Sequence, residues 1–98
     1  MILRIFRAIV HDGRQSDFEK FIRGKALPLI RAQQGLPFVT VGLPRSESPN
    51  EFSMVTAWRD LEALKGFTGE SWRQAVVLPE ETHMLRDSYL HHYEVAES

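Results

Sequence analysis

The sequence contains no cysteine and shows no marked excess of charge of either sign. The absence of cysteine excludes disulfides, thiolate nucleophiles and cysteine-ligated metals. With 12 Lys plus Arg against 13 Asp plus Glu, the chain lacks the positive field that binds phosphate backbones and anionic lipids. We therefore expect neither a nucleic acid nor a membrane as a partner.

Signal segments, internal repeats and low-complexity tracts are also missing. A secretory leader would combine a basic start, an apolar run and a small-residue cleavage site, so a cytoplasmic protein is the expectation. The 98 residues predict a single domain, residues 1–98. A domain of this size buries only about two-thirds of the surface that its unfolded chain exposes, and a partner would have to supply further burial.

What the chain does contain begins with a strand pattern and a helix pattern. Residues 2–10 are rich in β-branched side chains and predict the first strand. Ser16 and Glu19 have the spacing of a capping box, so a helix should begin there and end near Gln34, before Gly35. Its apolar stripe on a 3.6-residue period consists of Phe18, Phe21, Ile22 and Leu29.

Pro28 falls inside this predicted helix. Its ring removes one hydrogen bond and presses on the carbonyl four residues earlier, which belongs to Gly24. Because glycine adjusts its backbone most easily, we expect a bend and not a break.

Residues 38–44, 51–58 and 88–95 predict three further strands. Three short helical pieces should separate the last two: one capped by Asp60 and ending near Phe67, one around Trp72, Ala75 and Val76, and one from Pro79 to Arg86.

This order of elements places both helical connections on one face of a four-stranded sheet, because crossovers are right-handed. The other face is then bare, although the first and third strands carry apolar side chains at both parities. Such a patch exceeds what soluble monomers usually expose, so we expect a homodimer through the open sheet face. The alternative is a monomer with an apolar sheet face.

Three stretches of the chain resemble the antibiotic biosynthesis monooxygenase family. They are VTAWRDLEALKGFTG at 55–69, ALPLIRAQQG at 26–35 and HHYEV at 91–95. The resemblance runs over most of the chain. It implies an α+β fold of ferredoxin-like βαββαβ topology, with a four-stranded antiparallel sheet, that pairs into a dimeric α+β barrel.

In family members that are enzymes, the resemblance implies oxygenation of an aromatic substrate without a metal or prosthetic group, in a pocket between helices and sheet. The substrate reduces dioxygen as a phenolate or enolate, while the protein excludes water, removes a proton and stabilises the anion. The haem-degrading branch carries asparagine, tryptophan and histidine where this chain has Arg7, Phe67 and Val77. We therefore expect no haem and no other cofactor.

Trp58, Phe67 and Trp72 are candidates for an aromatic substrate slot, and core packing is the alternative for each. His92 and Tyr93 are further binding candidates from the last strand. Neighbouring strand residues point to opposite faces, so which of the two strand histidines faces the pocket stays open. No helix has the His-x-x-x-His spacing of a metal site, and none is expected.

His83 is the candidate proton acceptor for a phenolic substrate, with Glu80 placed to hold its ring. A solvated helix histidine is the alternative. Arg4 and Arg7 lie on opposite faces of the first strand, where guanidinium groups are costly unless paired. We prefer an interface ion pair with Glu51 or Glu94, and the alternative is that Arg7 binds a substrate oxygen.

The resemblance implies a cofactor-independent monooxygenase acting on a small aromatic or quinol-type substrate. The alternative is a non-catalytic dimeric protein that binds a hydrophobic ligand or serves as a scaffold, because one fold hosts unrelated functions. An open aromatic pocket with His83 or Arg7 pointing inward would favour catalysis. A core without a cavity would favour the scaffold.

Overall fold

The sheet is built around β1 (Ile2–Val10), which carries apolar side chains at both parities. The computed structural model describes residues 1–97. β1 pairs antiparallel with β3 (Glu51–Trp58) and β4 (Leu85–Glu94), and β2 (Phe38–Gly42) pairs with the far edge of β3. The resulting order β2-β3-β1-β4 is the α+β, ferredoxin-like arrangement that the sequence predicts.

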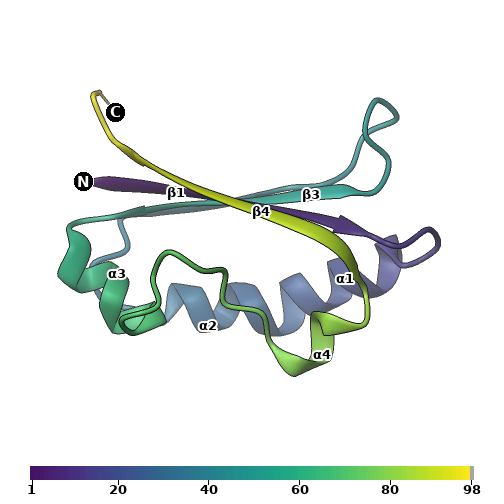
Figure 1. Ribbon diagram of the computed structural model, residues 1–98, viewed down its shortest axis with the longest axis horizontal. Coiled ribbons are helices and arrows are strands. Elements are labelled where there is room, and N and C mark those ends of the chain that lie inside the picture. The colour runs from purple at the N-terminus through teal and green to yellow at the C-terminus, as the bar shows by residue number, and fades with distance from the viewer. Residues whose placement is uncertain (98) are drawn as a thin grey trace.

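All helices lie on one face of this sheet (Figure 1). The first connection holds α1 (Gln15–Phe21), the π-helical segment η1 (Ile22–Ala26) and α2 (Leu27–Arg31). The second holds α3 (Leu61–Thr68) and α4 (Pro79–Thr82). The opposite face of the sheet is uncovered in the single chain, as expected from the right-handed crossovers.

The start and the end of the first helix differ from the prediction. α1 begins at Gln15, with Arg14 as its N-cap and no side-chain cap bond, so the Ser16 capping box is wrong. α2 ends at Arg31, and Gly35 follows with φ 75°. A Cβ on Gly35 would lie 2.6 Å from the Cβ of Ala63, so this position requires glycine for space as well as for conformation.

The helix continues through Pro28, as predicted. Ala26 and Leu27 keep right-handed helical angles, and the turn before the proline is the π-helical segment η1, which contains Gly24. A π-helical turn takes an extra residue, which moves the apolar stripe by one position. Ile30 is therefore buried at 6% exposure, whereas the predicted core residue Leu29 is 40% exposed.

Residues 69–78 form turns and coil, so the helical piece predicted around Trp72 is wrong. The cause lies in a distant strand, because the carbonyls of Trp72 and Gln74 accept hydrogen bonds from the Arg4 guanidinium. α4 ends at Thr82 and β4 begins at Leu85, both earlier than the sequence suggests.

The main core lies between the central strands and α1. Phe18 of α1 meets Phe52 of β3 edge to face, with ring centroids 4.8 Å apart. The buried cluster around this pair contains Ala8, Val10, Phe18, Ile22, Phe52 and Met84. Phe6 and Met54 pack against this cluster but are only partly buried. Their part of the sheet lines a pocket.

Candidate functional site

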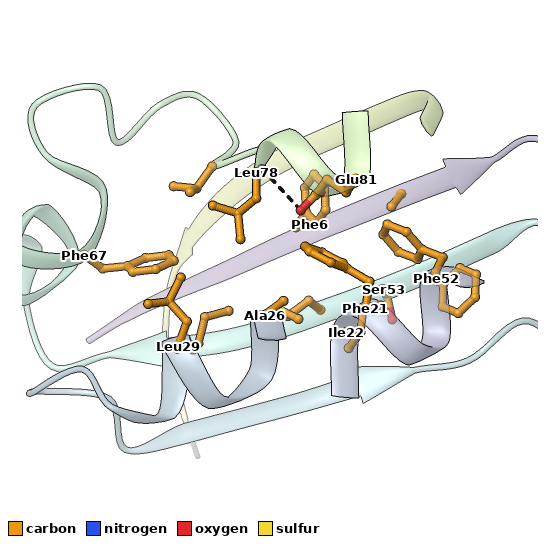
Figure 2. Close-up of a pocket in the computed structure, with 15 residues that line it drawn as sticks. Phe6, Phe21, Ile22, Ala26, Leu29, Phe52, Ser53, Phe67, Leu78 and Glu81 are labelled. Carbon is orange, nitrogen blue, oxygen red and sulfur yellow. Dashed lines mark hydrogen bonds between the residues drawn. The ribbon is translucent and has the colours of Figure 1, made fainter. Parts of the chain in front are cut away.

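An apolar pocket lies between the sheet and the helices (Figure 2). Its cavity volume is about 50 Å³. Val76 and Leu78 of the 69–78 coil contribute to its wall. Five phenyl rings, from β1, α1, β3 and α3, form much of the rest: Phe6, Phe18, Phe21, Phe52 and Phe67.

A second hollow of about 50 Å³ continues this pocket, because the two share Phe6, Ile30, Met54, Phe67 and Val76. The second hollow adds two polar residues, Arg4 and Thr56. The first contains Glu81. The two hollows together form one apolar slot with a cation in one part and a carboxylate in the other.

The slot in this form is too small for an aromatic ring, since cavities that bind benzene are about 150 Å³. A ligand must therefore displace part of the wall. The 69–78 coil is the part of the wall that has no helix or strand hydrogen bonds. Its contacts with the sheet include the two hydrogen bonds that Arg4 donates to it.

Arg4 is 5% exposed, although it carries a charge. Its Nη1 donates to the carbonyl of Trp72 at 2.6 Å, and its Nη2 donates to the carbonyl of Gln74 at 3.1 Å. Burial lowers the pKa of Arg4 to about 10, which leaves the guanidinium protonated at neutral pH. None of the ion pairs found within residues 1–97 includes Arg4.

His92 lies beside Arg4, with its Nε2 at 2.8 Å from Nη1. Arginine has only donors, so Nε2 accepts and the ring is neutral with its proton on Nδ1. Burial, followed by the charge of Arg4, lowers the pKa of His92 and favours this neutral form. The ring of Trp72 meets His92 edge to face at 5.2 Å.

Glu81 is 4% exposed and lies in the pocket wall (Figure 2). Its Oε2 accepts a hydrogen bond from the backbone N–H of Leu78 at 3.3 Å. Burial raises the pKa of Glu81, and the Leu78 hydrogen bond opposes the shift. A buried carboxyl group with a raised pKa in an apolar pocket is suited to proton transfer.

The three predicted aromatic residues take different positions. Phe67 lines both hollows and stacks on Trp58, with centroids 5.5 Å apart. Trp58 itself is fully buried, and its Nε1 donates to Oγ1 of Thr56 at 2.9 Å, so it supports Phe67 from the core. The ring of Trp72 contacts His92, and the carbonyl of Trp72 accepts a hydrogen bond from Arg4. Trp72 does not line either hollow.

Arg7 and Tyr93 lie on the open face of the sheet, away from the pocket. Arg7 forms an ion pair with Glu51 at 3.6 Å, one of the two partners predicted, within the chain. Its guanidinium also lies over the ring of Tyr89, 4.8 Å from the centroid. Tyr93 is 52% exposed. The substrate roles of Arg7 and Tyr93 stay predictions without support from the pocket geometry.

His83 is exposed at the end of α4 and does not line the pocket. Glu80, the residue expected to hold its ring, instead pairs with Lys25. The catalytic role of His83 therefore also stays a prediction. Within residues 1–97 there is no group of three side chains able to hold a metal ion, and no helix is long and apolar enough to cross a membrane.

Sequence reasoning missed Glu81 as a site residue and favoured Arg7 over Arg4. Arg4 shares its parity with Phe6 and Ala8, which face the helices. Once the two faces of the sheet are assigned, this parity predicts that Arg4 also faces the helices. Glu81 follows Pro79 and has the ordinary pattern of a helix start, so nothing in the sequence marks its burial.

Comparison with known proteins gives a consistent result at the level of structure. No family model and no curated protein matches the chain. A candidate antibiotic biosynthesis monooxygenase from Bordetella bronchiseptica is 22% identical, with TM-score 0.73 and coverage of 98% of this chain and 97% of that one. A candidate from Deinococcus radiodurans is 17% identical, with TM-score 0.78 and coverage of 100% and 95%.

A variant of SnoaB, a cofactor-independent oxygenase from Streptomyces nogalater, is also similar. It is 17% identical to this chain, with TM-score 0.72 and coverage of 99% of this chain and 94% of SnoaB. Identities this low establish shared structure and leave activity open. The chain thus has the fold of the antibiotic biosynthesis monooxygenases over its full described length.

Proposed function

We propose that the protein is a cofactor-independent monooxygenase that acts on a small aromatic or quinol-type substrate. The observation that carries this proposal is the buried carboxyl group of Glu81 in a pocket walled by phenyl rings. The fold shared with SnoaB, which is named a cofactor-independent oxygenase, supports the same reaction class.

In this proposal the pocket supplies position, exclusion of water and a base. The phenyl rings stack on the substrate and keep water from it. The Glu81 carboxylate takes the proton of a substrate hydroxyl, which leaves an electron-rich anion that reduces dioxygen. A quinol and dioxygen then give a hydroxyquinone and water, so the substrate supplies all the electrons.

The test is oxygen uptake by the purified protein with quinols and polyphenols, after a binding screen that includes flavins and haem. Trp58 stacks on Phe67, so ligands in the slot should quench tryptophan fluorescence. We expect uptake with a quinol that binds, and a fall of about 100-fold or more in Glu81→Gln, since a positioned base contributes about that much.

Glu80→Gln is the matched control for this experiment. Glu80 lies on the same short helix, pairs with Lys25 and does not line the pocket. The same chemical change at Glu80 should leave oxygen uptake within about twofold, since exposed ion pairs contribute little. Equal rates for Glu81→Gln and wild type would contradict the role of Glu81, and no uptake with any binder would contradict the enzyme.

A non-catalytic dimeric ligand-binding or scaffold protein is the second candidate. The small size of the two hollows favours it, because each has only about 50 Å³ in this form. Tight binding of a ring compound without oxygen uptake would favour a ligand-binding protein. The absence of any binder would favour a scaffold.

In both cases we propose that the protein is a homodimer through the open sheet face. Three large side chains on that face are strongly exposed in the single chain: Phe38 at 49%, Tyr89 at 39% and Tyr93 at 52%. Tyr93 lies opposite Leu3 of β1, and Phe38 lies opposite Ala57 of β3. A second copy would cover this surface in a twofold arrangement.

A further inference from the structure

Arg4 is buried, and none of the carboxylates within residues 1–97 pairs with its positive charge. The guanidinium has five donor hydrogens, and its contacts are two backbone carbonyls and the neutral ring of His92. These partners satisfy hydrogen bonds but carry no negative charge. A buried charge that only dipoles stabilise is costly, and an anion placed nearby would relieve that cost.

The guanidinium is also accessible from the slot. Arg4 lines the second hollow together with Phe6, Met54 and Phe67. A ring that lies between these side chains would therefore have its edge close to the cation. The other polar residue there, Thr56, is already engaged, because its Oγ1 accepts from Trp58 and donates to the carbonyl of Arg4.

We infer that Arg4 makes the pocket selective for aromatic ligands that carry an oxyanion. A hydrogen bond between two charged groups in a poorly hydrated site is shorter and stronger than one between neutral groups. The inference rests on the proposed use of the pocket as a ligand site, and it does not require turnover.

The test compares 4-nitrophenol with 4-nitroanisole, which has the same ring but cannot ionise. Calorimetric titrations run without oxygen, at a pH where 4-nitrophenol is ionised and Arg4 is still protonated. We expect the phenolate to bind at least about tenfold more tightly, as hydrogen bonds to charged groups imply. The absorbance of bound 4-nitrophenol should also show a lower hydroxyl pKa than in water.

Arg4→Gln should abolish this preference, whereas Arg4→Lys, which keeps the charge, should retain part of it. Arg45→Gln makes the same change in net charge on an exposed loop, where Arg45 pairs with Glu47, and should leave the preference intact. If Arg4→Gln does not fold, the inference is tested by the preference of the wild type for 4-nitrophenol and by the part of that preference that Arg4→Lys retains.

Equal or tighter binding of 4-nitroanisole by the wild type, or no binding of 4-nitrophenol, would overturn the inference. So would an unchanged preference in a folded Arg4→Gln variant. Because oxygen takes no part in the measurement, an anion preference without oxygen uptake on any quinol would sustain this inference and remove only the oxygenase proposal.

Discussion

At the scale of single residues, Glu81 combines deep burial with an ionisable group. Burial raises its pKa in the folded state above the unfolded value, so the fold binds this proton more tightly. The stabilisation is complete below the unfolded pKa and is lost as the pH rises through the folded pKa. Above the folded pKa the buried carboxylate is therefore a destabilising charge.

This sign gives a first prediction for Glu81→Gln. At neutral pH the variant should be more stable than the wild type, because it removes a buried charge and keeps the shape of the side chain. The advantage should shrink as the pH falls and Glu81 becomes protonated. Thermal unfolding of both proteins from acidic to neutral pH measures it, and a constant difference across that range would contradict the buried charge.

The two tryptophans should contribute unequally to stability, which is a second prediction. Trp58→Phe leaves a cavity and removes the hydrogen bond to Thr56, so it should cost about 1–3 kcal/mol. Trp72→Phe keeps an aromatic ring beside His92 and leaves the carbonyl bonded by Arg4 unchanged, so it should cost less than about 1 kcal/mol. Urea unfolding compares them, and equal losses would contradict the assignment of Trp58 to the core.

At the scale of elements, local signals predicted those segments whose pattern or cap is carried by their own residues. β3 and α3 follow from alternation and from the Asp60 cap, whose Oδ1 accepts from the N–H of Ala63 at 2.8 Å. The 69–78 coil could not be predicted in this way, because Arg4 binds its carbonyls from 68 and 70 residues away. Likewise, the π-helical turn shifts burial from Leu29 to Ile30. A prediction from a regular 3.6-residue period does not include this change of register.

Two glycines in the first connection should respond oppositely to alanine, which is a third prediction. Gly35→Ala forces a positive φ on alanine and a contact with Ala63, so it should destabilise by about 1–3 kcal/mol. Gly24→Ala meets no atom within 4 Å and lies in a helical turn, so it should stabilise by about 0.4–1 kcal/mol. Denaturant midpoints test both, and a neutral Gly35→Ala would show that the turn relaxes freely.

At the scale of the whole molecule, sequence patterns predicted the fold well and the site poorly. The order of elements predicted a sheet with one open face, and the apolar residues at both parities of β1 predicted that this face needs cover. Whether a polar residue of a strand belongs to the pocket depends on which face of the sheet its side chain lies on. Arg4 and Arg7 differ only in parity, yet one enters the pocket and the other forms an ion pair on the opposite surface.

Self-association is the fourth prediction, and it belongs to this scale. Ile5→Asp places a charge at the middle of the open sheet face, where Ile5 lies between Val55 and His91. If two copies meet through that face, the variant should sediment as a monomer at concentrations where the wild type is a dimer. Lys20→Asp, on the exposed side of α1, serves as the control and should stay dimeric. A dimer that persists in Ile5→Asp would place the interface elsewhere.

The contacts of Arg4 also bear on when the pocket can form. The guanidinium comes from the first strand, while its partners Trp72, Gln74 and His92 lie 68, 70 and 88 residues later. Contacts between segments so far apart form slowly, because the intervening chain must first be ordered. During synthesis, a chain that has not yet released its last strand has β1 without one neighbour and Arg4 without His92. The pocket beside Arg4 is therefore among the last parts of the molecule to be assembled.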